Sequence, residues 1–196
     1  MPSPVGHILI GTAVHLAGTR RKFRSRTTLA ITLLGSIVPD LDFLPGILIG
    51  KMGAFHHGIS HSLTLAILFG VLVFLFVRPV DKAIAVRTSM LAAVAYASHV
   101  GLDFIGVNEG TRGVPIFWPL TDEKFGLSLN LFGHFRWGDI REGLGTIIRW
   151  ENVVPILREI MICGTAVLLL LWRDRRSSWK SRSIVPQQSP KSSRFA

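Results

Sequence analysis

Long stretches with few or no charged residues dominate the hydrophobic pattern of the chain. They cover residues 28–50, 62–77, 88–107 and 153–172, and a shorter apolar stretch covers 4–17. A helix of about 20 residues crosses the roughly 30 Å hydrocarbon core of a membrane, so the four longer stretches reach or approach the required length. The pattern therefore predicts membrane-spanning helices, about four or five in number.

Composition supports this prediction. Hydrophobic residues make up 48% of the 196 residues and charged residues only 17%, which excludes disorder over most of the chain. A compact soluble all-α protein is the alternative, but it would need polar helix faces that these stretches do not supply. The single cysteine, Cys163, excludes an intrachain disulfide and a cysteine-based zinc site.

Basic residues gather at the ends of the apolar stretches. The chain has 22 basic and 12 acidic side chains, and 15 of the basic ones lie within residues 20–26, 78–87 and 173–194. With five spans, all three clusters fall on one face, which the positive-inside rule makes cytoplasmic. Attraction to anionic lipid then explains the charge, and no nucleic acid is expected. Residues 1–172 form one membrane domain, and the Ser-, Pro- and Arg-rich residues 173–196 are predicted to be a disordered, basic, cytoplasmic tail.

Ionisable side chains within the apolar stretches indicate function, because a charge is costly to bury in lipid. His99 and Asp103 are four residues apart and share one face of a helix. Asp40 and Asp42 follow Pro39, which removes a helical hydrogen bond and predicts a broken helix at the Pro-Asp-x-Asp motif. Such a break exposes carboxylates to a cavity where they can bind a metal ion.

These groups and several histidines converge on one depth. At 1.5 Å per residue, Asp40 lies ~18 Å along its helix and His99 ~16 Å along its own, both past the middle of the membrane. The loop before residues 62–77 lies at the same outer level and carries three histidines. The histidines that join the acids at this level are His7, His56, His57 and His61. His15 lies nearer the inner end and is excluded, and His134 lies in the long outer loop without a spacing that requires it.

Imidazole and carboxylate ligands together favour Zn²⁺, Mn²⁺ or Fe²⁺ over Ca²⁺ or Mg²⁺. The candidates outnumber the four ligands of one tetrahedral zinc, so we expect two or three ions, or one ion with outer carboxylates and a general base. Asp42 is a ligand, an orienting carboxylate, the general base or only a helix cap. His57 is expected either to support a metal ligand from outside or to face the substrate, and not to be a ligand itself. The proposed metal ligands are His7, Asp40, His56, His61, His99 and Asp103.

Five short motifs occur in a specific order between residues 5 and 120. They are Gly6-His7, Pro39-Asp40-Leu41-Asp42-Phe43, His56-His57-Gly58-Ile59-Ser60-His61-Ser62, Ser98-His99-Val100-Gly101-Leu102-Asp103 and Gly113-Val114-Pro115-Ile116-Phe117-Trp118-Pro119. Together they resemble the YdjM family of membrane-bound metal-dependent hydrolases, some of which are described as LexA-regulated. The family pattern His-Arg-Gly-x-Thr-His-Ser has its arginine replaced here by His57 and its threonine by Ser60. A distant similarity to the all-helical zinc-dependent phospholipase C and P1-nuclease group implies a phosphoester substrate, by analogy.

These interpretations combine into one hypothesis. The chain is expected to be an all-α, polytopic inner membrane protein, with its metal centre towards the extracytoplasmic face and its C-terminus in the cytoplasm. A divalent metal, zinc or else manganese or iron, would activate water for attack on an ester, with Asp42 and His57 at catalytic positions. A phosphoester of a lipid or of another membrane-delivered substrate would suit this location. The alternatives are a metal- or proton-handling transporter and a structural membrane protein stapled by its metal.

Overall fold

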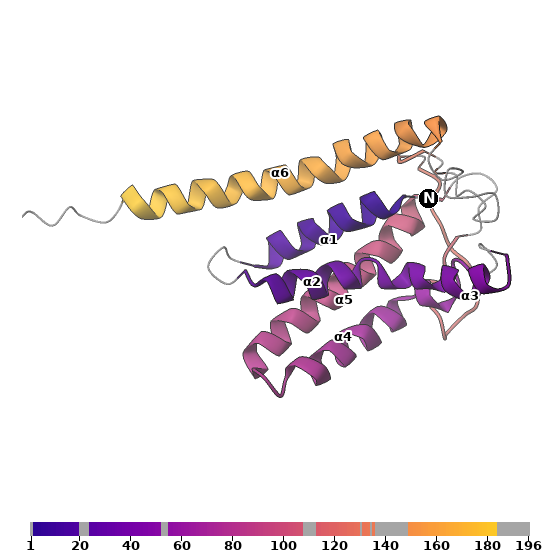
Figure 1. Cartoon of the computed structure of the whole chain (residues 1–196), viewed down its shortest axis with the longest axis horizontal. Helices are drawn as coiled ribbons and strands as arrows, with labels where there is room; N and C mark the ends of the chain where they lie inside the picture. Colours follow the sequence, from indigo (N-terminus) through magenta and orange to yellow (C-terminus); the bar gives the residue numbers. More distant parts are fainter. Residues whose placement is uncertain are drawn as a thin grey trace, which may run out of the picture.

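The chain folds into a bundle of α-helices (Figure 1). The structure is a computed structural model, and it describes residues 2–19, 24–51, 55–107, 113–129, 131–133, 135 and 149–183. Over these residues the all-α class is confirmed, because the regular elements are helices and the bridges Gly106–Ser128 and Val114–Phe125 are isolated. In chain order the elements are α1 (Pro4–Gly18), α2 (Arg26–Gly35), the 3-10 helix η2 (Val38–Asp42), α3 (Phe43–Leu48), the 3-10 helix η3 (Ile59–His61), α4 (Leu63–Val77), α5 (Lys82–Ile105), the 3-10 helix η6 (Trp150–Asn152) and α6 (Val153–Ser183).

Polar caps fix where four of the helices begin. In each case the side-chain oxygen of the residue before the helix accepts a hydrogen bond from a backbone N–H of the first turn. The cap residues are Ser3 for α1, Ser25 for α2, Ser62 for α4 and Asp81 for α5. These caps break the apolar pattern into separate helices that run up and down the bundle.

Helix α5 is the centre of the bundle and packs against α1, α2 and α4. Its buried face is built from small side chains, with Ala85, Ala92 and Ala95 fully buried. Gly35, the last residue of α2, lies so close that a Cβ there would approach the carbonyl oxygen of Ala92 to 2.6 Å. Small residues thus bring the backbones of α2 and α5 together at the level where the polar residues gather.

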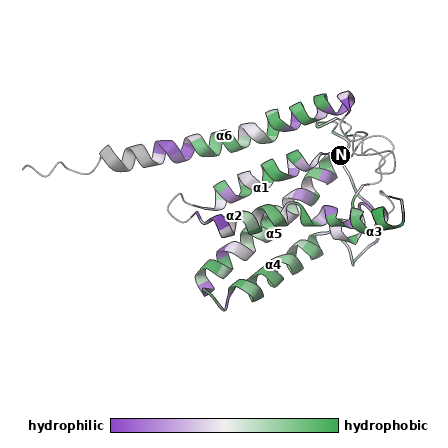
Figure 2. Cartoon of the chain, in the orientation of Figure 1, coloured by the Kyte–Doolittle hydropathy of each residue, from purple (hydrophilic) through white to green (hydrophobic). Residues whose placement is uncertain are grey.

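The distribution of polar and apolar side chains is that of a membrane protein. Large apolar side chains cover the outside of the bundle, for example Ile67 and Phe76 of α4 and Leu168 of α6 (Figure 2). Polar side chains such as Thr32 and His99 are fully buried inside. In a water-soluble domain this arrangement would expose a very large apolar surface.

Two helices are long and apolar enough to cross a membrane, α5 and the segment Trp150–Ser177 that includes most of α6. A third candidate is the pair Arg26–Gly35 and Val38–Leu48, whose two parts are bent by 50°. Helices α1 and α4 are apolar but shorter, with 15 residues each. The structure therefore supports two or three spans by length and composition, fewer than the four or five that the hydrophobic pattern predicts.

Helix α6 continues well past the last apolar residue of its stretch and ends at Ser183. The prediction of a disordered tail from residue 173 is thus wrong for residues 173–183, and residues 184–196 lie outside the described part. The segment contains no proline or glycine, and the guanidinium of Arg176 lies 3.9 Å from the ring centroid of Trp172, one turn earlier. Both features favour continuation of the helix.

A buried carboxylate fastens α6 to the start of α1. Glu159 of α6 is fully buried, and its oxygens accept hydrogen bonds from the backbone N–H of Ser3 at 2.7 Å and of Gly6 at 3.0 Å. The Ser3 hydroxyl donates a third. The two N–H donors belong to the otherwise unsatisfied N–H groups at the positive end of a helix, so a carboxylate is favoured there.

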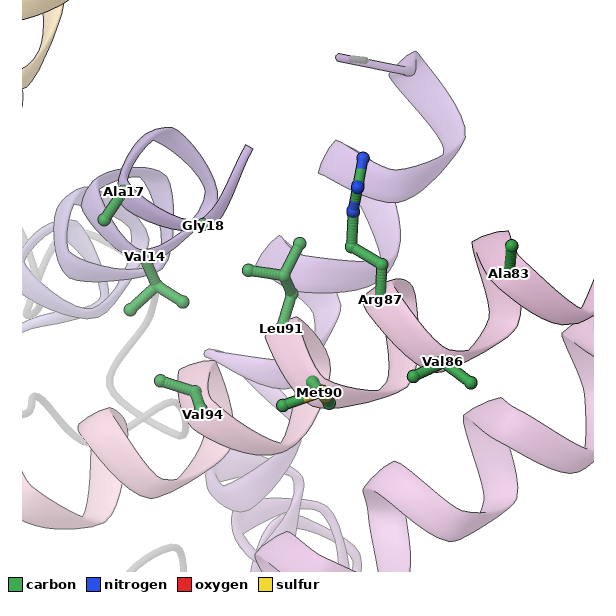
Figure 3. Close-up of a pocket in the computed structure, with 9 residues that line it drawn as sticks. All are labelled: Val14, Ala17, Gly18, Ala83, Val86, Arg87, Met90, Leu91 and Val94. Carbon is green, nitrogen blue, oxygen red and sulfur yellow. The ribbon is translucent and has the colours of Figure 1, made fainter. Parts of the chain in front are cut away.

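A groove of about 670 Å³ lies between the last part of α1 and the first part of α5 (Figure 3). Its lining residues are Val14, Ala17 and Gly18 from α1 and Ala83, Val86, Arg87, Met90, Leu91 and Val94 from α5. Eight of the nine are apolar or glycine, so the groove is an apolar surface with one cationic side chain.

Replacing the Glu159 carboxylate by an amide should destabilise the protein. In Glu159→Gln, only one oxygen remains to accept hydrogen bonds from Ser3 and Gly6. The amide N–H₂ group replaces the other oxygen and faces donors with which it cannot bond. We expect a loss of about 1–3 kcal/mol in the free energy of unfolding, measured in detergent. Glu151→Gln, at an exposed glutamate just before α6, is the matched control and should change little. Equal stability of the two variants would contradict the role given to Glu159.

Candidate metal centre

The polar residues predicted to form a site come from four helical elements and one loop, and they meet at one end of the bundle. Asp40 and Asp42 lie on η2, His61 on η3, and His99 and Asp103 on α5. The possible metal-binding atoms form two groups, and the atoms of each group lie within 4.8 Å of one another. His61 belongs to both groups. The first group is Asp40, His61, His99 and Asp103, and the second is His56, His57 and His61.

His99 is oriented by the backbone of the broken helix pair. Its Nδ1 donates a hydrogen bond to the carbonyl oxygen of Ser36 at 2.8 Å, and since a carbonyl can only accept, the proton lies on Nδ1. The Nε2 atom therefore presents its lone pair to the centre of the group. It lies 3.1 Å from Asp103 Oδ2 and 3.5 Å from Asp40 Oδ1.

His61 is oriented in the same way by a carboxylate. Its Nδ1 lies 3.2 Å from Asp42 Oδ2 and 3.0 Å from the Ser60 hydroxyl, which itself donates to Asp42 at 2.9 Å. Its Nε2 faces Asp103 Oδ2 at 3.3 Å and Asp40 Oδ1 at 3.8 Å. Burial by itself lowers the pKa of His61, but the nearby carboxylates of Asp103, Asp40 and Asp42 raise that pKa well above its usual value.

The centre of the first group is suited to a cation. The Nε2 atoms of His61 and His99 face each other at 3.3 Å, and neither neutral ring, protonated on Nδ1, has a proton to place between them. Asp103 Oδ2 is buried beside both nitrogens and accepts no hydrogen bond of good geometry from the described residues. Two lone pairs and two carboxylates converging on one point are stabilised by either a proton or a metal ion. The residues present therefore fit a divalent ion of the zinc, manganese or iron type.

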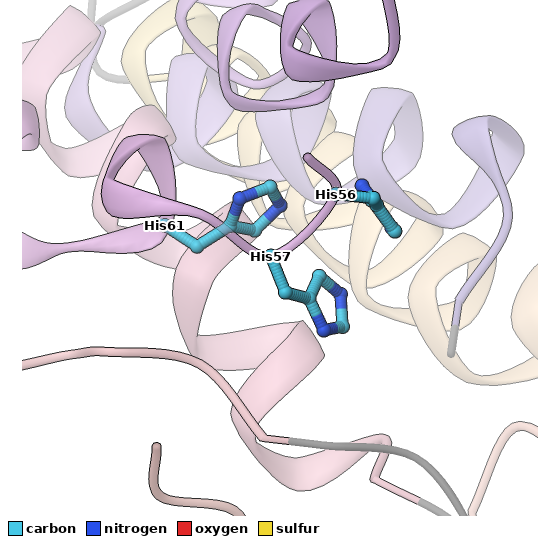
Figure 4. Close-up of side chains that lie close together, drawn as sticks. All are labelled: His56, His57 and His61. Carbon is cyan, nitrogen blue, oxygen red and sulfur yellow. The ribbon is translucent and has the colours of Figure 1, made fainter. Parts of the chain in front are cut away.

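The second group, His56, His57 and His61, lies in the segment before α4 (Figure 4), and two of its members contact Asp42 of η2. His56 Nδ1 lies 3.1 Å from Asp42 Oδ1, so this carboxylate contacts His56 through one oxygen and His61 through the other. His57 is buried, and its Nε2 lies 3.8 Å from Asp103 Oδ2. Its φ of 59° is unfavourable for a residue with a Cβ, so the loop holds His57 in a constrained position.

His7 lies on the opposite side of Asp103. Its Nε2 is 3.6 Å from Asp103 Oδ1, and its ring stacks on that of His99 with centroids 3.7 Å apart. His7 does not belong to the first group, which consists of Asp40, His61, His99 and Asp103. His15 lies two turns further along α1, away from this end, as predicted from the sequence, and His134 lies outside the described residues.

The centre is closed on the side of α1 and α5 and most open on the side of η2. His61 and His99 are fully buried, whereas 16% of the Asp40 side chain is exposed. Exposed apolar side chains lie on the same part of the chain, since Leu41 of η2, Leu44 of α3 and Ile59 of η3 are each about half exposed.

Three contributions to the centre were not predicted from the sequence. The Ser36 carbonyl orients His99, the Tyr96 hydroxyl donates to the Ser60 carbonyl at 2.6 Å, and Glu159 holds the start of α1 next to His7. Only Glu159 carried a signal in the sequence, as an acid inside a predicted span. A backbone carbonyl has no sequence signature.

Comparison with known proteins agrees with the apolar exterior of the bundle. The family model of the YdjM inner membrane proteins matches residues 1–177. This chain belongs to the YdjM family. The inner membrane protein YbcI of Escherichia coli (strain K12) is 25% identical over 185 residues, covering 90% of this chain and all of YbcI. No solved structure matches the chain. As a YdjM family member the chain is an inner membrane protein, and its His/Asp group could hold a metal ion.

Removing either side chain that the α5 helix contributes to the first group should abolish metal binding. We expect a divalent metal to co-purify with the unaltered protein and to be lost from both His99→Gln and Asp103→Asn, because each change removes one of the four side chains that converge on the centre. His15→Gln, at another buried histidine, should keep it. Metal content measured by mass spectrometry on protein of equal helicity checks this. Retention of metal by both α5 variants would show that the ion lies elsewhere.

Removing the Asp42 carboxylate should weaken the site without abolishing it. Asp42→Asn leaves all four members of the first group in place but loosens His61, and loss of such an outer partner typically costs 10–100-fold in metal affinity. Asp122→Asn, at an exposed aspartate, is the matched control. Competition with a chelator gives the affinities, and an unchanged value for Asp42→Asn would exclude an orienting role.

Proposed function

We propose that this YdjM family protein is a metal-dependent hydrolase that cleaves an ester, with a phosphoester of a lipid or of another membrane-delivered substrate as the substrate class. The observation that carries the proposal is the convergence of Asp40, His61, His99 and Asp103 on one buried point. A divalent ion bound there would act as a Lewis acid and lower the pKa of a coordinated water towards neutrality. His7 and His56 would be further ligands if more than one ion binds.

The chain's own residues have distinct tasks in this proposal. Ser36 and Asp42 fix the rings of His99 and His61 so that each directs Nε2 to the centre. Asp42 also contacts His56 and lies at the more open side, where it can accept a proton from attacking water. His57 lies beside Asp103 and can orient an anionic group of the substrate when protonated.

The exposed apolar side chains on η2 and α3 support a substrate from the membrane. Leu41 and Leu44 are exposed beside the two aspartates, and the neighbouring Leu48 is 86% exposed. Such side chains on the elements that carry a polar centre would favour a substrate that carries both an ester and an apolar part. A small soluble phosphoester gains nothing from them.

We also propose five spans, formed by α1, the bent pair α2 to α3, α4, α5 and α6. The start of α1, the end of α5 and the start of α6 lie at the same end of the bundle, as this topology requires (Figure 1). At 1.5 Å per residue the 15 residues of α1 and α4 reach only about 22 Å. Flanking residues or local thinning of the bilayer would make up the difference. The metal centre then faces the extracytoplasmic side.

Transport of a metal ion or of protons is the second candidate function, and buried polar residues between the centre and the other end favour it. Thr32, Thr28 and Thr88 follow one another inside the bundle, and His15 is buried on α1 with no hydrogen bond to its Nδ1 among the described residues. The Thr32 hydroxyl donates to a carbonyl of its own helix. The acidic groups of the centre, by contrast, all lie at one depth, which suits a closed site better than a path.

Hydrolysis by the purified protein should rise from pH 5 to pH 8 in excess metal. The raised pKa of metal-free His61 means that protons compete with the metal even above the ordinary histidine pKa of about 6.5, so occupancy rises with pH. The assay follows release of nitrophenol from a nitrophenyl phosphodiester in detergent, with Asp103→Asn as the inactive control. A flat profile at constant metal content, or equal rates for the variant, would contradict the hydrolase. Uptake into vesicles that is fastest at low outside pH would favour the transporter.

The proposed topology predicts opposite labelling of two single cysteines. With Cys163 replaced by serine, Ser189→Cys in the tail should resist a membrane-impermeant maleimide in intact cells, because the basic clusters keep that face in the cytoplasm. Glu123→Cys, in the loop after α5, should react. Labelling of Ser189→Cys from outside would overturn both the topology and the face assigned to the metal centre.

A further inference from the structure

The groove between α1 and α5 lies far from the metal centre. Arg87, which lines it, and Asp103 are 16 residues apart on α5, or about 24 Å along the helix. The groove therefore cannot be the entrance to the centre. It lies near the end of the bundle at which α1 ends and α5 begins.

The walls of the groove match the chemistry of an acyl chain. Val14 and Ala17 of α1 stand opposite Leu91 and Val94 of α5, with Met90 and Val86 continuing the α5 wall (Figure 3). Met90 and Val94 are more than half exposed, although both belong to a helix that packs on three others. A protein of the inner membrane has lipid at such a surface, and a chain lying in the groove would bury these side chains further.

The end of the groove carries positive charge and hydroxyl groups. A second hollow adjoins it and shares Ala83 and Arg87. The other residues that line this hollow are Arg24, Ser25, Thr28, Ile84 and Thr88. Arg24 pairs with Asp174, and the described residues that line the two hollows include no acidic one. Arg87 is exposed at the point where the apolar groove meets the polar hollow.

We propose that this groove is a binding site for one anionic phospholipid. An acyl chain lies between α1 and α5, and the phosphate contacts Arg87 at the junction of the two hollows, where a guanidinium can bind two phosphate oxygens at once. The apolar walls would bind the acyl chain of the lipid, and Arg87 would bind its anionic headgroup. Neither feature alone would select this ligand. The proposal does not depend on the hydrolase activity.

Lipid titrations of the delipidated full-length protein in detergent test this site. Native mass spectrometry would follow the binding of phosphatidylglycerol, phosphatidylcholine and soluble glycerol phosphate. We expect at least tenfold tighter binding of phosphatidylglycerol than of phosphatidylcholine, and no competition from glycerol phosphate at the same concentration. Equal affinities for the two lipids, or competition by glycerol phosphate alone, would overturn the proposal.

Variants separate the two parts of the site. Arg87→Gln should remove the preference for phosphatidylglycerol, whereas Arg78→Gln, at an exposed arginine that caps α4, should keep it. Ala17→Phe should fill the groove and weaken the binding of both lipids at least tenfold. If that variant does not fold, Met90→Trp provides the same block from α5. Equal effects of the two arginine variants, no effect of the filled groove, or a dimer that Ala17→Phe dissociates would each contradict the assignment.

Discussion

Charged groups inside an apolar bundle must be compensated by one another, and this constraint governs the rest of the structure. Three carboxylates and several imidazoles lie together at one end of the bundle, where burial leaves little water to stabilise them. Their mutual distances of 3.1 to 3.8 Å provide the compensation, with Asp103 contacting His7, His57, His61 and His99. A divalent cation would complete it, which is why the same arrangement that makes the bundle stable also makes it a candidate metal centre.

The helices are positioned to meet this constraint. Gly35 allows α2 to end against Ala92, and the chain then turns so that the next carbonyl, that of Ser36, accepts from His99. The bend that follows places Asp40 and Asp42 beside the histidine loop. At the other side, Glu159 satisfies the N–H groups at the start of α1 and thereby keeps His7 beside Asp103. Some elements thus supply the side chains of the centre, and α2 and α6 supply contacts that hold them in place.

The sequence predicts most of the site residues but less of the way they are held. The four-residue spacing of His99 and Asp103, and the position of Asp40 after Pro39, were enough to predict that these groups meet, and the structure brings them within 4.8 Å of one another. Orientation depends on the Ser36 carbonyl and on Asp42, whose role the sequence left open between ligand, base and cap. Span boundaries were harder because charged residues such as Lys82 and Arg173 extend α5 and α6 beyond their apolar stretches. Residues 173–183 of the predicted tail are helical because they contain no proline or glycine to end α6.

X-ray absorption spectroscopy of the metal-loaded protein tests the central claim most directly, because it reports the ligands of the ion itself. The account predicts a first shell of nitrogen and oxygen only, with the outer-shell scattering of at least two imidazoles from His61 and His99 and with carboxylate oxygens from Asp40 and Asp103. The single cysteine, buried on α6, should contribute no sulfur. A shell of oxygens without imidazole scattering, or one containing sulfur, would contradict the assignment of these four residues as the metal centre.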